Sequence, residues 1–135
     1  MQKSAAILLA AALLVGCQAR ETGQIKPEMK AQYDAAFQDM LNKPGDVAVA
    51  LKYATVAKEA GDLEGAIGTY EGLLLVDSDL PEIRVELGML YYRLKSYDVA
   101  RSNFEAALRS PSLPEALRKP TVQMLSKMPK QRGRS

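Results

Sequence analysis

The chain contains no histidine, no tryptophan, one cysteine and only two phenylalanines in 135 residues. The absence of histidine removes the side chain that most often acts as a general base near neutral pH and as a metal ligand. One cysteine is too few for an internal disulfide or for a zinc site made of cysteines. We therefore expect no enzyme, no metal site and no cofactor.

The chain also lacks a large excess of charge of either sign. Its 18 basic and 16 acidic residues give a formal net charge of +2, which is too small to indicate nucleic-acid binding. Hydrophobic residues make up 47 % and charged residues 25 %, a composition typical of folded proteins. Length and composition together predict a single globular domain.

No apolar run reaches the roughly 20 residues that a permanent transmembrane helix needs. The run over residues 5–15 follows a short segment with one positive charge, Lys3, and this order is typical of a secretory signal peptide. Gly16 follows the run and directly precedes Cys17, which resembles the lipobox of bacterial lipoproteins. The resemblance implies a signal peptide over residues 1–16 and a diacylglycerol on the thiol of Cys17. The alternatives are a plain secretory signal with a chance cysteine, and a short buried helix.

The residue after the cysteine bears on the location of the anchor. Gln18 stands where an aspartate favours retention in the inner membrane of enterobacteria, so the resemblance implies the periplasmic face of the outer membrane. Residues 17–27 are mostly polar and show no apolar period. We expect them to form the lipidated N-terminus and a flexible tether.

The remainder of the chain repeats with a period of about 34 residues. Between Leu87 and Pro111 it contains the segments L-G-x2-Y and A-x3-F in the order and spacing of the tetratricopeptide (TPR) motif, with Arg84 at the tryptophan position. The residues one period earlier are of kinds that the motif tolerates. The residues predicted to pack helices together are Tyr53, Ala54, Ala57, Ala66, Tyr70, Leu73, Leu87, Gly88, Tyr91, Ala100, Phe104 and Ala107.

The resemblance implies an all-α fold, a TPR solenoid of helix-turn-helix units. One such hairpin cannot bury its apolar face alone, so neighbouring hairpins must stack. We expect two full repeats, 47–80 and 81–114, within a TPR domain over residues 28–128; a generic helical bundle is the alternative. The expected helices, of which the first and last are half repeats or caps, cover residues 28–42, 47–60, 63–76, 81–94, 97–109 and 114–127.

Local signals predict several helix ends. Gly61 is expected to end one helix, and Lys95 lies in the equivalent turn of the second repeat. Residues 79–82 and 112–115 have the form of capping boxes that open two later helices. Pro120 is expected to kink the last helix or to delay its start.

The last helix has no following helix to cover it. Either polar residues make its open side a cap, or apolar residues stay partly exposed and accept a partner. We favour the partner, because methionine-rich faces suit adaptable binding. The polar candidates are Lys119, Gln123 and Lys127, and the apolar ones are Met124, Leu125 and Met128.

In TPR proteins the first helix of each repeat lines a concave groove, so the resemblance places a partner-binding surface on helices 47–60 and 81–94. Tyrosine and arginine on this surface are residue types that often dominate interface energies; the alternative is that these are merely solvated helix faces. Leu51 and Thr55 stand where the carboxylate clamp of chaperone-binding TPR domains needs lysine and asparagine, so that ligand is not expected. The predicted groove residues are Leu51, Lys52, Thr55, Lys58, Glu82, Val85, Glu86, Met89, Tyr92 and Arg93.

Charge is distributed unevenly along the mature chain. Residues 17–117 hold 11 basic and 16 acidic side chains, a net charge of −5, whereas residues 118–135 hold six basic and no acidic ones. We expect residues 129–135 to form a disordered basic tail. The tail either contacts anionic lipid headgroups near the anchor or only increases solubility.

The repeats also resemble those of particular envelope proteins. Residues 62–67 and 80–111 are similar to the periplasmic repeats of surface-lipoprotein-assembly modifiers, in which such repeats precede a β-barrel. The chain further resembles small repeat lipoproteins that help to assemble pili or outer-membrane complexes. These resemblances imply a protein partner in the cell envelope.

Two classes of function fit these observations. The first is a non-catalytic adaptor, held on the membrane through Cys17, that binds a protein of an assembly, export or pilus system. The second is an envelope hydrolase with a carboxylate pair. Its candidate acids, however, fall at helix positions expected to be exposed, where nothing raises the pKa of a catalytic acid. We therefore expect the adaptor, with no nucleic-acid partner and no small-molecule substrate. The candidate acids are Glu59, Asp62, Glu64 and Glu71.

Overall fold

The computed structural model describes residues 24–130 of the chain. The predicted signal peptide, Cys17 and the last five residues lie outside this range. Within it, all regular secondary structure is helical, so the predicted all-α class is confirmed. The elements are η1 (Pro27–Met29), α1 (Lys30–Asn42), α2 (Val47–Ala60), α3 (Leu63–Val76), α4 (Pro81–Arg93), α5 (Tyr97–Arg109) and α6 (Glu115–Lys127).

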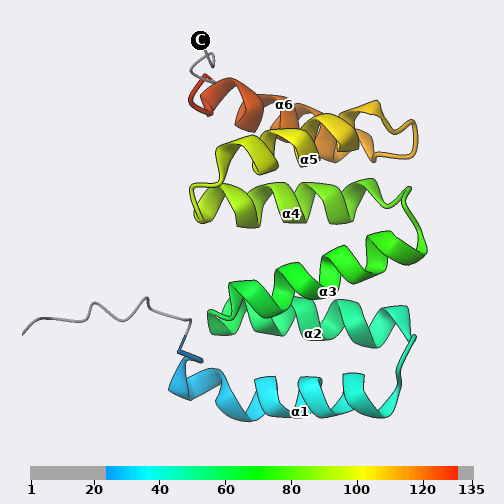
Figure 1. The fold of residues 1–135 in the computed structure, drawn as a ribbon, viewed down its shortest axis with the longest axis vertical. Coiled ribbons are helices and arrows are strands. Elements are labelled where there is room, and N and C mark those ends of the chain that lie inside the picture. Colours follow the sequence, from blue (N-terminus) through cyan, green and yellow to red (C-terminus); the bar gives the residue numbers. More distant parts are fainter. Residues whose placement is uncertain (1–23, 131–135) are drawn as a thin grey trace, which may run out of the picture.

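The helices are stacked in the order in which they occur along the chain. Figure 1 shows α1 at one end of the stack and α6 at the other, with short turns alternating between the two edges. Each helix packs mainly on its neighbours in the sequence, and the most extensive packing is between α4 and α5. The molecule therefore has two long edges made of turns and two faces made of helix sides.

The two central hairpins repeat with the predicted offset. Helix α2 begins at Val47 and α4 at Pro81, one repeat period later, and the starts of α3 and α5 are separated by the same interval. The turns repeat as well. Gly61 (φ 100°) and Lys95 (φ 60°), also one period apart, both have left-handed backbone conformations. Glycine adopts this conformation without strain, whereas lysine does so at a cost.

The helix starts correct two expectations. Residues 79–82 and 112–115 do not form capping boxes, because the N-cap residues are Leu80 and Pro114, neither of which makes a side-chain cap. Pro81 occupies the first position of α4, where its missing N–H costs nothing. Side-chain caps occur instead on the first hairpin, where Asp46 accepts from the backbone N–H of Val49.

The predicted packing residues form the interior. All twelve are buried except Tyr91, which is partly buried. One core cluster extends over α1 to α4 and a second joins α4, α5 and α6. Gly88 lies against Phe104 so closely that a Cβ atom on Gly88 would be 2.5 Å from the phenylalanine Cε1. The close helix contact predicted at Gly88 is therefore present.

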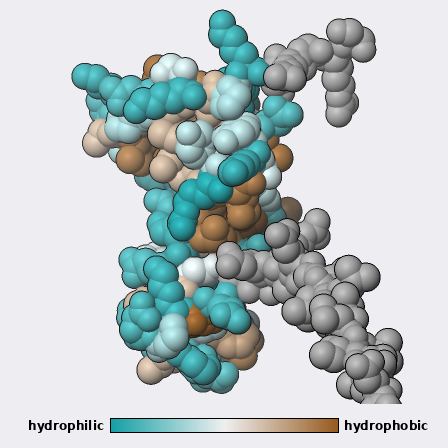
Figure 2. Space-filling view, turned by 90° about the vertical axis from the view of Figure 1, so that its left-hand side faces the viewer, coloured by the Kyte–Doolittle hydropathy of each residue, from teal (hydrophilic) through white to brown (hydrophobic). Residues whose placement is uncertain are grey.

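The junction between α3 and α4 combines modest packing with polar links. These helices pack on each other less extensively than α2 on α3 or α4 on α5. Figure 2 shows hydrophobic side chains reaching the surface at a waist between the lower and upper groups of helices. Across the junction, Tyr91 Oη donates to Glu71 Oε1 at 2.6 Å, and Lys58 Nζ donates to Glu86 Oε2 at 2.6 Å.

The last turn of α6 and the residue after it lie on the second core, and one of the three apolar residues expected to stay partly exposed is buried there. Met128 is only 4 % exposed and packs with Ala100 and Phe104, and Met124 and Leu125 are partly buried against the same cluster. The backbone beyond α6 turns back toward α5, where Arg101 donates to the carbonyl of Pro129 at 2.9 Å. The helix begins at Glu115 and continues through Pro120, so its start is not delayed.

Part of the predicted tether lies against the body of the domain. The backbone N–H of Lys26 donates to the carbonyl of Ala60 at 3.0 Å, and η1 then leads into α1. Residues 24–27 are thus placed at the turn between α2 and α3. Residues 17–23 lie outside the described range.

Candidate partner-binding surface

The first helices of the two hairpins carry adjoining polar stripes. On α4, Glu82, Glu86, Met89 and Arg93 follow one another at intervals of three or four residues, which places them on one helix face. The ion pair between Lys58 of α2 and Glu86 of α4 links the two helices at this point. The predicted groove therefore has an ion pair at its centre.

Local electrostatics strengthen this ion pair. Burial acts to lower the pKa of Lys58, but the hydrogen bond and the charge of Glu86 outweigh it, and the pKa lies above its usual value. Beneath the pair, burial raises the pKa of the Tyr70 phenol, while the nearby Lys58 charge partly offsets this rise. The centre of the surface is thus charged, and its two charged groups, Lys58 and Glu86, are paired with each other.

The structure divides the predicted groove residues into two groups. Five are exposed and five are partly buried. Lys52 is turned toward α1, with its Nζ 3.5 Å from Asp39 Oδ2. The Thr55 hydroxyl donates to the carbonyl of Leu51 in its own helix. The exposed residues are Lys52, Thr55, Glu82, Met89 and Arg93, and the partly buried ones are Leu51, Lys58, Val85, Glu86 and Tyr92.

The side chain of Tyr92 packs against other residues and is only partly exposed at the surface. Its ring packs edge-to-face on Tyr97 with the centroids 5.5 Å apart, and it lies against the second core cluster. Val85 contacts the same cluster. Tyr92, predicted as a groove residue, is therefore partly taken up by packing, and Met89 and Arg93 are the more exposed of the predicted groove residues near the end of α4.

The acidic residues considered as catalytic candidates are dispersed. Glu59, Glu64 and Glu71 are exposed, as expected. Asp62 is partly buried, because its Oδ1 caps α3 by accepting from the N–H of Gly65 while its Oδ2 accepts from Tyr33 at 2.7 Å. Within residues 24–130, no three acidic or thiol side chains gather as a metal site requires. In the same range, no helix combines the length and apolar character of a membrane span.

The tyrosines that link helices give the fold a predicted dependence on alkaline pH. The hydrogen bond to Glu71, with burial and the glutamate charge, raises the pKa of Tyr91 to about 12. Burial, hydrogen bonds and the charge of Asp62 also raise the pKa of Tyr33. A raised pKa in the folded state stabilises the fold below the unfolded pKa of about 10, and this stabilisation is lost as the pH rises toward 12.

We expect the free energy of unfolding, measured by urea denaturation, to fall between pH 9 and pH 11.5. Tyr91→Phe, which removes one of the titrating phenols, should make that fall shallower. Tyr97→Phe is the control. The Tyr97 ring contacts Tyr92, but among the described residues its hydroxyl donates to no carboxylate, unlike that of Tyr91. Constant or rising stability over this interval would contradict the interpretation.

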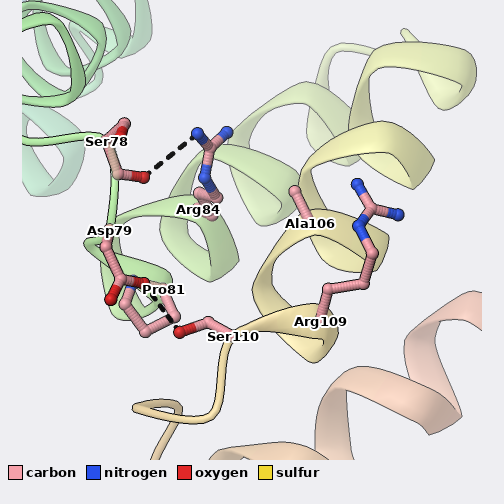
Figure 3. A pocket seen from close by; sticks show the side chains of 7 residues that line it. All are labelled: Ser78, Asp79, Pro81, Arg84, Ala106, Arg109 and Ser110. Atoms are coloured by element: carbon pink, nitrogen blue, oxygen red, sulfur yellow. Dashed lines mark hydrogen bonds between the residues drawn. The ribbon is translucent and has the colours of Figure 1, made fainter.

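A further feature, not indicated by the sequence pattern, is a pocket on the edge that carries the α3–α4 loop. It has a volume of about 260 Å³ and is bounded by that loop, the first turn of α4 and the end of α5. Figure 3 shows the guanidinium groups of Arg84 and Arg109 extending to the same side, with Ala106 between them. Arg84 is the residue that departs from the TPR motif, which was the one signal available in the sequence.

No protein-family model matches this chain, and no significantly similar curated protein was found. The features that indicate a function are the repeat, the geometry of the exposed surfaces and the N-terminal sequence.

Proposed function

We propose that the chain is a lipid-anchored TPR adaptor of the bacterial cell envelope, which binds a protein partner on the surface shared by α2 and α4. The observation that carries this proposal is the constant offset of the two hairpins, in helix starts and in turn conformation. Such an offset is what a TPR solenoid requires. The Lys58–Glu86 ion pair links the corresponding faces of α2 and α4, and we propose that an extended segment or helix of a partner contacts both.

The character of the surface supports binding and not catalysis. Thr55, Met89 and Arg93 are exposed around a central ion pair, which offers an apolar contact, a cation and hydrogen-bonding groups. Methionine adapts its shape to different partners, and arginine is enriched among residues that dominate interface energies. An outer-membrane location on the periplasmic side and a role in envelope assembly, export or pilus formation complete the proposal.

Lipidation is tested by Cys17→Ala. When the chain is produced in bacteria fed labelled palmitate, the wild type should incorporate label and the variant should not, because Cys17 is the sole thiol in the sequence. Gln18→Ala, which changes the next residue and keeps the cysteine, is the matched control and should remain labelled. Equal labelling of wild type and Cys17→Ala would contradict the lipoprotein assignment.

Partner binding is tested by a photoreactive amino acid at Met89, which should crosslink one specific envelope protein. Met89→Ala combined with Arg93→Ala should then weaken capture of that protein at least about tenfold, or about 1.4 kcal/mol, with an unchanged circular-dichroism spectrum. The control is Val122→Ala with Lys119→Ala, an exposed apolar residue and cation on α6. Equal loss in both pairs, or none in the first, would contradict the groove assignment.

A further inference from the structure

We propose a second binding site on the edge opposite the α2–α3 and α4–α5 turns, in which Arg84 and Arg109 hold a carboxylate of an acidic peptide segment. This site goes beyond the adaptor function proposed above, because it lies on a different surface and does not depend on the groove residues. Its elements are the pocket of about 260 Å³ and the apolar end of α3 beside it.

The arginine pair provides the anion-binding groups. Arg84 Nη2 donates to the carbonyl of Ser78 at 3.2 Å, which holds its guanidinium at the rim and leaves other N–H donors available. Among the described residues, Arg109 has no hydrogen-bond or ion-pair partner. The small side chain of Ala106 separates the two groups, so a carboxylate between them can accept hydrogen bonds from both (Figure 3).

The carboxylate of the pocket itself does not occupy this position. Asp79 Oδ1 accepts from Ser110 Oγ at 2.7 Å and from Ser112 Oγ at 3.4 Å. Figure 3 shows the Asp79–Ser110 contact on the other side of the pocket from the two guanidinium groups. The pocket lining thus carries two arginines against one carboxylate, on a body whose residues 17–117 carry a net charge of −5.

An apolar contact adjoins the pocket and selects a peptide over a free anion. Leu75 and Val76 are 89 % and 85 % exposed at the end of α3. Val76 precedes Ser78 by two residues, so their Cα atoms are within about 7 Å of each other. Earlier in α3, Gly68 and Gly72 have no other atom within 4 Å of the place where a Cβ would lie. A partner segment with an aliphatic side chain near a glutamate or aspartate matches this combination.

The apolar contact and the arginine site occupy related positions in the repeat. Leu75 and Val76 lie one repeat period before Arg109 and Ser110, so they hold equivalent positions in successive hairpins. The first hairpin thus presents an aliphatic pair where the second presents a cation and a hydroxyl. A partner peptide that lies along this edge would contact the aliphatic pair of the first hairpin and then the cation of the second.

The test is fluorescence anisotropy with the full-length chain in detergent and a fluorescein-labelled peptide of alternating leucine and glutamate. Arg84→Gln with Arg109→Gln should weaken binding at least about tenfold, and so should replacing each glutamate of the peptide with glutamine. Leu75→Ser with Val76→Ser should also weaken it. Lys119→Gln, which removes an exposed cation on α6 outside both proposed surfaces, is the matched control and should leave binding unchanged.

The remaining outcomes overturn the proposal. No binding by the wild type, equal binding of the glutamine peptide, or an equal loss in Lys119→Gln would each exclude a carboxylate site at this pocket. If millimolar inorganic phosphate displaces the peptide completely and the Leu75 and Val76 changes have no effect, the pocket is a simple anion site. Failure of the Met89 crosslink, by contrast, affects only the adaptor proposal.

Discussion

Gly88→Leu is expected to lower the free energy of unfolding by about 3 kcal/mol or more and the thermal midpoint by more than about 10 °C. The reason is the contact with Phe104, whose ring is fully buried between α4 and α5. Even the first side-chain carbon at position 88 would come within 2.5 Å of that ring. A leucine adds three more carbon atoms against the same ring, so the two helices must separate.

The same position and a matched glycine give a graded test. Gly88→Ala should cost on the order of 1–3 kcal/mol through overpacking. Gly68→Ala should instead stabilise the domain by about 0.8–1 kcal/mol, because Gly68 is exposed inside α3 with no atom near a new Cβ. Thermal unfolding followed by circular dichroism measures both.

A second-site change identifies the contact responsible. Phe104→Leu makes the facing residue smaller, so in a Gly88→Ala background it should cost less than it does alone. Additive effects of the two changes would show that the clash is elsewhere. An unchanged midpoint in Gly88→Leu would show that Gly88 is not at a helix contact in solution.

Much of the helix pattern was predictable because each hairpin contains residues that mark the ends of its helices. Gly61, with its left-handed backbone, marks the end of α2. Lys95 lies one repeat period later and has the same backbone conformation after the end of α4. The start of α4 was predicted at the correct residue but for an incorrect reason. Proline is favoured at the first helical position, so the N-cap must be the preceding residue, Leu80, and Asp79 is one position too early to cap.

The surfaces were less predictable, because periodicity assigns a residue to a helix face but not to the neighbours that cover it. Tyr92 follows the groove register, yet its ring reaches Tyr97 and the second core. Met128 lies past the end of α6, where the path of the chain decides its burial. Arg84 and Arg109 line one pocket because the start of α4 meets the end of α5, and no local sequence signal encodes that contact.

Asp62→Ala is expected to destabilise the domain by about 2–4 kcal/mol, more than the loss of a helix cap alone. One carboxylate oxygen caps α3, and such caps contribute about 1 kcal/mol. The other accepts from Tyr33 on α1 at 2.7 Å and from Tyr53 on α2 at 3.4 Å. Hydrogen bonds to a charged acceptor contribute roughly 1.5–3 kcal/mol, and the longer contact contributes less.

The comparison with Asp46→Ala separates these contributions. Asp46 also caps a helix through its carboxylate, but it is exposed and accepts from the N–H of Val49, with no tyrosine hydroxyl among its described partners. Its removal should therefore cost only about 1 kcal/mol. Asp62→Asn keeps the cap acceptor and can hydrogen-bond a tyrosine hydroxyl, so it should fall between the two. If Asp62→Ala and Asp46→Ala cost the same, the hydrogen bonds from the tyrosines add nothing to stability, and the apolar packing of α1 on the first core cluster holds it in place.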